Sequence, residues 1–125
     1  MADTEELILS RLSGYAGLIA LIGSRIYPLT IPQECSLPAL TYMVISDPPE
    51  HAMGNDADIS TMRMQISCLA DSYKSAKAVY AQVKAALSRY RAGTIKDIFL
   101  ETPMDDFEPE TSVFQIIVDF TIYHS

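Results

Sequence analysis

Residues 59–90 read ISTMRMQISCLADSYKSAKAVYAQVKAALSRY and join a strand pattern to a helix pattern. Over residues 59–70 apolar and polar side chains alternate, which is the period of a strand with one buried face. The apolar set is Met62, Met64, Ile66 and Cys68, and the polar set is Thr61, Arg63, Gln65 and Ser67. From Ser72 to Tyr90 apolar residues recur every three or four positions, as on the buried side of a helix, and Gly93 follows as a stop signal. This stretch predicts a strand followed by a helix that packs on the apolar face of a sheet.

Three further strands are predicted on either side of this pair. Residues 39–46 (ALTYMVIS) are apolar on both alternating faces and rich in strand formers, which is typical of a central strand covered on both sides. Residues 97–102 and 113–123 have strand patterns too, and the second alternates strictly between apolar and polar positions. We expect these last two strands to pair as a hairpin.

The N-terminal segment predicts a helix broken in two. Asp3 has the chemistry of a helix cap, with Glu6 three residues on as its reciprocal partner. Gly14 and Gly17 interrupt the apolar pattern that follows, so we expect a longer and a shorter piece, the second ending near Ile22. The next residues, 26–28, are expected to be extended.

The order of elements is helix, strand, strand, helix, strand, strand, with no repeat or linker that would divide residues 1–125 into two units. This order predicts a single α+β domain with two layers, in which an antiparallel four-stranded sheet carries two main helices on one face. The other face of the sheet would be only half covered.

Composition excludes several classes of protein. The chain has 125 residues, the size of one domain, and a formal charge of −7, which repels nucleic-acid phosphates. Its N-terminus is acidic where a secretory signal is basic, and its apolar runs are far shorter than the roughly 20 residues of a membrane span. We therefore expect a cytoplasmic protein with no membrane partner, and we interpret Cys35 and Cys68 as reduced thiols.

The residues that could carry chemistry do not converge in the sequence. His51, His124, Cys35 and Cys68 are scattered over separate elements without the spacing of metal ligands. Acidic pairs such as Asp105 and Asp106 fall in a segment expected to be solvated, and no glycine-rich turn resembles a nucleotide-binding loop. We expect no enzyme activity and no cofactor, and we interpret the chain as an interaction protein.

Two acidic segments, 47–58 and 101–111, are the candidate interaction loops. Each joins adjacent predicted strands with more residues than a hairpin needs, and such long loops are usually kept for contact with a partner. The candidate residues are His51, Met53, Asp56 and Asp58 in the first segment and Met104, Asp105, Asp106, Phe107, Glu108 and Glu110 in the second. We expect Phe107 and Met53 to act as apolar anchors while the acids steer the approach. The alternative is a solvated loop whose aromatic residue packs back on its own domain.

The chain resembles, nearly from end to end, the small tail-completion or tail-terminator proteins of long-tailed bacteriophages. The resemblance rests on RIYP at residues 25–28, on LPALTY at 37–42, on MQISCLADSY at 64–73 before an alanine-rich helix, on FEPET at 107–111 and on VDFTIY at 118–123. Ser112 departs from the pattern, because glycine is expected in the last hairpin.

The resemblance implies a virion structural protein, assembled in the host cytoplasm, that forms a ring of six subunits at the head-proximal end of the tail tube. Such a ring stops tube polymerisation and joins the tail to the head. The implied partners are other copies of the chain, the tail tube protein and the head-completion or connector protein, with DNA only passing through the channel. Apart from the resemblance, a ferredoxin-like ligand-binding or regulatory domain of a cytoplasmic bacterial protein remains an alternative, since the fold alone does not decide function.

Overall fold

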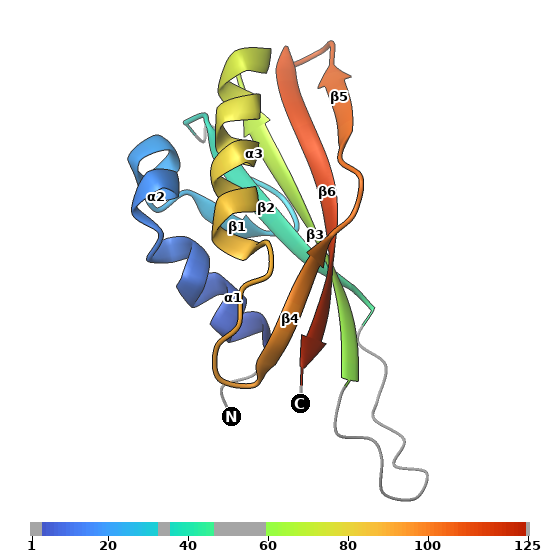
Figure 1. Ribbon diagram of the computed structural model, residues 1–125. Coiled ribbons are helices and arrows are strands. Elements are labelled where there is room, and N and C mark those ends of the chain that lie inside the picture. The colour runs from blue at the N-terminus through green and yellow to red at the C-terminus, as the bar shows by residue number, and fades with distance from the viewer. Residues whose placement is uncertain (1–3, 33–35, 47–59, 125) are drawn as a thin grey trace, which may run out of the picture.

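The computed structural model describes residues 4–32, 36–46 and 60–124. The helices are α1 (Thr4–Ser13), α2 (Ala16–Ile22) and α3 (Tyr73–Leu87). The strands are β1 (Ile26–Pro28), β2 (Ala39–Ser46), β3 (Ser60–Ala70), β4 (Ile95–Leu100), β5 (Met104–Glu108) and β6 (Val113–His124). Figure 1 shows all the described helices on one face of a twisted sheet, so the α+β class and the placement of helices on one face are confirmed.

The sheet is built around the antiparallel pair of β3 and β6, whose register runs from Ser60 opposite His124 to Ala70 opposite Phe114. The strand order is β1-β2-β3-β6-β4, and β5 also pairs with β6. β4 pairs with the C-terminal half of β6 and β5 with its N-terminal half, so the two short strands follow one another along the same edge (Figure 1). The predicted pairing of the strand at 97–102 with that at 113–123 is confirmed for β4 and β6. The predicted hairpin is wrong, because β5 lies between them in the sequence and pairs with β6 itself.

The prediction of a four-stranded antiparallel sheet is wrong, because the described sheet has six strands and is mixed. β1 pairs in parallel with residues 40–42 of β2, and its three residues are too few to show an alternating pattern. β5 lies in the segment predicted to be a loop. Its sequence, MDDFE, is poor in strand formers, and only the pairing with β6 makes it a strand.

β2 lies inside the sheet as predicted, between β1 and β3. The expectation that both of its faces are covered holds only for its first half. Ala39 and Leu40 are fully buried, whereas the side chains of Met43 and Ile45 are 39% and 43% exposed. The reason is that Met43 and Ile45 lie on the sheet face away from the helices, because Leu40, Tyr42 and Val44 take the helix side opposite the buried Cys68, Ile66 and Met64.

The core lies between the helices and the sheet. Apart from Ala70, its members from β3, α3 and β6 are the residues that the sequence periodicity selects: Met62, Met64, Ile66, Cys68, Ala76, Val79, Val83, Ala86, Leu87, Ile116, Val118, Phe120 and Ile122. Tyr15, Tyr80 and Tyr90 are partly buried against this core.

The helix ends follow local backbone chemistry. The break between α1 and α2 is confirmed, with Tyr15 extended ahead of α2. The Ser72 hydroxyl caps α3 by accepting a hydrogen bond from the Ser75 backbone N–H at 3.1 Å. α3 ends at Leu87, earlier than predicted, because Ser88 is extended and Arg89 has a positive φ of 60°.

Candidate interaction surfaces

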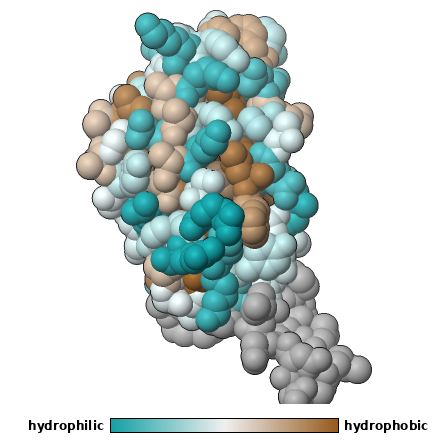
Figure 2. All heavy atoms as spheres, in the orientation of Figure 1, coloured by the Kyte–Doolittle hydropathy of each residue, from teal (hydrophilic) through white to brown (hydrophobic). Residues whose placement is uncertain are grey.

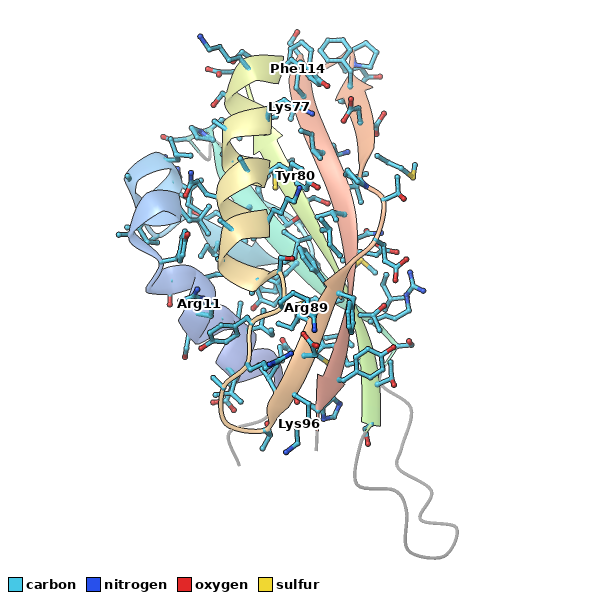
Figure 3. All side chains as sticks on the ribbon, viewed as in Figure 1. Arg11, Lys77, Tyr80, Arg89, Lys96 and Phe114 are labelled. Atoms are coloured by element: carbon cyan, nitrogen blue, oxygen red, sulfur yellow. The ribbon has the colours of Figure 1, made fainter. Side chains whose placement is uncertain are left out.

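An aromatic cluster lies where the N-terminus of α3 meets β5 and β6. Phe107 is opposite Phe114 in the β5–β6 register, and their ring centroids are 4.6 Å apart. Tyr73, at the start of α3, meets Phe114 edge to face with a centroid distance of 6.4 Å. Tyr73 and Phe107 remain 44% and 45% exposed. We call these three residues the aromatic cluster, and Figure 3 shows Phe114 at this end of the molecule.

Acidic groups line the rim of the aromatic cluster. The Tyr73 hydroxyl donates a hydrogen bond of 2.8 Å to the Asp105 carboxylate, and this bond raises the pKa of Tyr73. The cluster, Asp105 and Asp106 surround an open hollow of about 330 Å³. Partly exposed aromatic rings around a hollow, with charged groups at the rim, are the composition of a protein-binding hot spot.

Residues 101–110, ETPMDDFEPE, hold five acids and no Lys or Arg. Asp106 accepts hydrogen bonds from the Gln115 side chain at 3.2 Å and from the Phe107 backbone at 2.9 Å. Glu108 accepts one from the Glu110 backbone at 3.2 Å. Among the described residues no Lys or Arg forms an ion pair with these acids, so this edge of the sheet presents a negative field to its surroundings.

The second candidate segment is therefore a strand and a turn where a long loop was expected, which corrects the sequence interpretation. Met104, Asp105, Asp106, Phe107 and Glu108 form β5, with all five side chains exposed, and Glu110 lies in the turn before β6. Pairing with β6 aligns Phe107 and Asp105 with the helix side and Met104, Asp106 and Glu108 with the opposite side.

The ring of Phe107 packs on Phe114 of its own domain, as the alternative expectation states, and nearly half of its surface stays exposed. Its role as an anchor for a partner stays a prediction. The first candidate segment lies outside the described residues, and with it His51, Met53, Asp56 and Asp58. Tyr73 and Phe114 were not selected from the sequence as interaction residues. In the sequence, the only sign of Tyr73 and Phe114 is that each is an aromatic residue at the end of a regular apolar pattern.

The sheet face away from the helices has a polar centre. Asp119 accepts hydrogen bonds from Arg63 at 3.0 Å and from Gln65 at 3.1 Å. Beside them the Thr121 hydroxyl donates to Glu101 at 2.8 Å. These cross-strand contacts satisfy the polar groups of the open face, so this face tolerates water and offers few unpaired groups to a partner.

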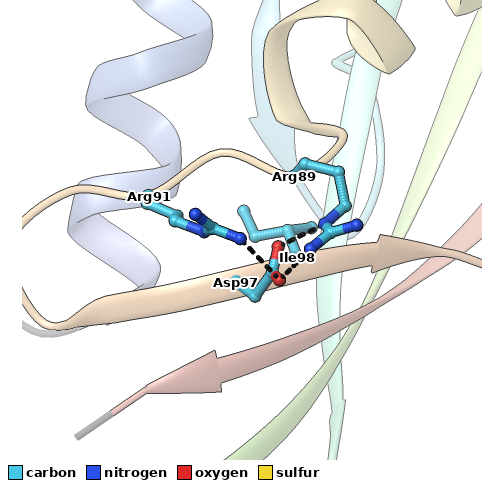
Figure 4. A network of polar contacts seen from close by, with 4 residues as sticks. All are labelled: Arg89, Arg91, Asp97 and Ile98. Carbon is cyan, nitrogen blue, oxygen red and sulfur yellow. Dashed lines mark hydrogen bonds and ion pairs between the residues drawn. The ribbon is translucent and has the colours of Figure 1, made fainter.

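The outer edge of β4 carries a small charge network (Figure 4). Asp97 accepts two hydrogen bonds from Arg89, of 2.9 and 2.8 Å, and a longer one of 3.4 Å from Arg91. The bonds from Arg89 lower the pKa of Asp97 to about 2. The Arg89 guanidinium also lies 4.8 Å from the ring centroid of Phe99, which packs edge to face on Tyr123. The network fixes the segment after α3 to the edge of the sheet.

A second hollow, of about 420 Å³, opens between α1 and the β1 edge. It is lined by Glu6, Leu9, Ser10, Ser13, Ser24, Ile26 and Tyr42. Its walls are a mixture of small polar and apolar groups. It holds no cluster of titratable side chains that would indicate catalysis.

The remaining candidates for chemistry are unreactive or isolated. Cys68 is fully buried, and burial raises the pKa of its thiol to about 12, so it is a packing residue. Within residues 4–32, 36–46 and 60–124 no group of His, Cys, Asp and Glu could hold a metal ion. Cys35 lies outside the described residues. None of the described helices has the length and apolar character to cross a membrane.

The described residues form a small α+β protein. Its aromatic cluster, the acids of β5 and the Asp97 network lie at the surface rather than in an enclosed site. The chain matches the family described as tail completion protein gp17 over residues 6–125. It belongs to this family and is a structural protein of a bacteriophage tail. The match confirms the resemblance noted in the sequence.

Comparison with solved structures gives the same fold. A chain from the virion of a native gene transfer agent particle superposes with a TM-score of 0.73 and 19% sequence identity. The superposition covers 94% of this chain and 90% of that chain, so the whole domain is shared. Comparison with curated proteins found no match.

Proposed function

We propose that the protein acts as a ring of six copies at the head-proximal end of the tail tube, where it terminates tube polymerisation and joins the tail to the head connector. The observation that carries this proposal is the family match over residues 6–125. The superposed chain comes from a virion particle, which supports a place in an assembled particle for this fold.

The surfaces agree with a role in assembly. The most exposed large apolar side chains of β5 are Met104 and Phe107, and both lie among the acids of that strand. Such small, mixed surfaces suit contacts that form only when several partners meet on a growing particle. The proposed partners are other copies of the chain, the tail tube protein and the connector protein. The function requires no cofactor and no catalytic group.

Simple geometry is compatible with a channel for DNA. A compact chain of this length has a radius of gyration of roughly 14 Å, so six copies in contact leave a central hole about as wide as one subunit. A negative net charge of −7 per chain keeps a passing duplex from binding the wall.

Deletion of the gene tests the proposal. We expect tails of irregular and excessive length together with heads that lack tails, both visible by negative-stain electron microscopy of lysates. Tails of normal length attached to heads would refute the capping and joining role. Purified protein should be monomeric when dilute and should form rings at high concentration or on isolated tubes, and a stable dimer at all concentrations would contradict the ring.

A further inference from the structure

The outer face of α3 is complementary to the acidic, aromatic end of the sheet edge in the same chain. α3 carries Lys74, Lys77 and Lys84 and no acid along its 15 residues. Its most outward positions are Lys74, Ala78, Ala81 and Ala85, all exposed. Alanine side chains leave a smooth helix surface that flat aromatic rings can approach closely, and Figure 2 shows this helix side as a mixture of hydrophilic and apolar residues.

One contact within α3 pairs a lysine with a ring of the aromatic cluster. The Lys77 ammonium lies 5.7 Å from the ring centroid of Tyr73, as a lysine lies over an aromatic face. Lys74 and Lys84 form no ion pair with any described residue, and neither do the acids of β5. Each chain thus presents a positive helix face and a negative aromatic edge, and no ion pair between described residues neutralises Lys74, Lys84 or the acids of β5.

We propose that the outer face of α3 in one copy binds the aromatic cluster and the acids of β5 in the next copy, as the repeated contact of the ring. The inference rests on the proposed function, because it assigns the partner surfaces within that ring. Lysines meet carboxylates and aromatic rings, and the alanines allow close approach. The contact joins two different surfaces, so it propagates from copy to copy, as a ring requires.

The relative direction of the two surfaces favours a closed ring. In a ring of six, the outward directions of the two contact surfaces differ by about 120°, whereas surfaces on exactly opposite sides build a filament. The outer face of α3 points away from the sheet, and β5 lies at the edge of that sheet (Figure 1). The two directions therefore differ by much less than a half turn.

Charge also rules against the hollow beside α1 as the site that receives β5. The hollow beside α1 has Glu6 in its wall, next to Glu5 on the same helix. An acidic strand would be repelled there and attracted by α3, and like charges across an interface oppose binding strongly.

Charge reversal in two complementary variants tests the contact. The first is Lys74→Glu with Lys84→Glu, and the second is Asp105→Lys with Asp106→Lys, the two acids that line the hollow of the aromatic cluster. Each is supplied from a plasmid to a host whose particle-producing locus lacks the gene, and tailed particles are counted. Each variant alone should lower the yield of tailed particles more than about tenfold through like-charge repulsion. Supplied together they should restore the yield, because an alternating ring regains opposite charges at every contact.

Lys96→Glu is the matched control, since Lys96 lies at the far end of the molecule from Lys77 (Figure 3) and should leave the yield unchanged. Purified variants should keep the wild-type melting temperature. If a double variant melts at a lower temperature, the two single charge reversals are tested in its place. Full yield with either variant alone would overturn the proposed contact, and so would a loss that the mixture does not restore. A gene deletion that leaves tailed particles intact would instead refute the proposed function itself.

Discussion

Phe107 lies directly opposite Phe114 in the β5–β6 pair, with ring centroids 4.6 Å apart, yet 45% of the Phe107 surface is exposed. The contact orients the ring without burying it. An aromatic residue held in one orientation loses little conformational entropy when a partner covers it, and this is the property of an interface anchor.

Replacement of this anchor should separate assembly from stability. Phe107→Ala removes one aromatic pair contact, worth about 0.5–1.5 kcal/mol, so the melting temperature should fall by only a few degrees. The yield of tailed particles should fall much further, because the exposed part of the ring contributes only in the assembled particle. Calorimetry and particle counts measure the two effects.

Phe99→Ala is the matched control, because Phe99 is 41% exposed and its ring centroid lies 5.6 Å from that of Tyr123. It should cost similar stability without the loss of particles. A large fall in melting temperature for Phe107→Ala, with particle yield in proportion, would assign Phe107 a purely structural role.

Ser112 should be replaceable by glycine with a gain in stability. Ser112 has a φ of 56°, in the left-handed region that glycine adopts without a steric penalty. The sequence resemblance leads to an expectation of glycine at this position, and the backbone angle supplies the reason. Ser112→Gly should raise the free energy of unfolding by about 1 kcal/mol, measured by urea titration. Ser88→Gly is the control, since Ser88 has a φ of −61° and the change should lower the free energy of unfolding. If Ser112→Gly lowered it and Ser88→Gly raised it, the backbone at Ser112 would not be strained.

The sequence predicts the parts of this fold that have strong periodicity. The apolar positions of β3, α3 and β6 are buried as expected, because each of these elements is long enough for its pattern to be read. β1 has three residues and β5 has an acidic sequence, so neither carries a signal of its own. Both become strands through pairing with a longer neighbour, which is a tertiary effect.

The sequence predicts only one part of the aromatic cluster. The composition of residues 101–111 singled out Phe107 and its acids, and the structure adds Tyr73 and Phe114 from distant parts of the sequence. Residues from α3 and β6 come together there only after the sheet has formed. No local pattern could have predicted that grouping.

Protonation of Asp97 should lower the free energy of unfolding in acid. Hydrogen bonds from Arg89 lower its pKa from the usual 3.8 to about 2 in the folded protein. A carboxylate with a lowered pKa stabilises the fold above its unfolded pKa, and this contribution disappears as the pH falls from 3.8 towards 2. Asp97→Asn should therefore be less stable than wild type at pH 7 and should show a shallower loss of stability across that window. Asp71→Asn, at an exposed position, is the control, and identical acid profiles for Asp97→Asn and wild type would contradict the assignment.

Arg11 should be irreplaceable by lysine, although lysine keeps the charge. Figure 3 shows Arg11 on α1. Its Nε–H donates a hydrogen bond of 2.8 Å to the Ala86 carbonyl, which ties α1 to α3. The same guanidinium plane lies 4.5 Å from the ring centroid of Tyr90 and 4.9 Å from that of Tyr15. A lysine ammonium is a compact group that cannot stack on two rings while it donates to a carbonyl.

Arg11→Lys should therefore lower the free energy of unfolding by about 1–2 kcal/mol, the range expected for a charge-assisted hydrogen bond with cation–π contacts. Arg91→Lys is the matched control, because Arg91 is 64% exposed and reaches Asp97 only at 3.4 Å. Its change should stay within about 0.5 kcal/mol. Chemical denaturation of the two variants at low and high salt separates packing from charge, since the loss at Arg11 should persist at high salt. Equal stabilities for the two variants would show that the guanidinium plane does not hold the two helices together.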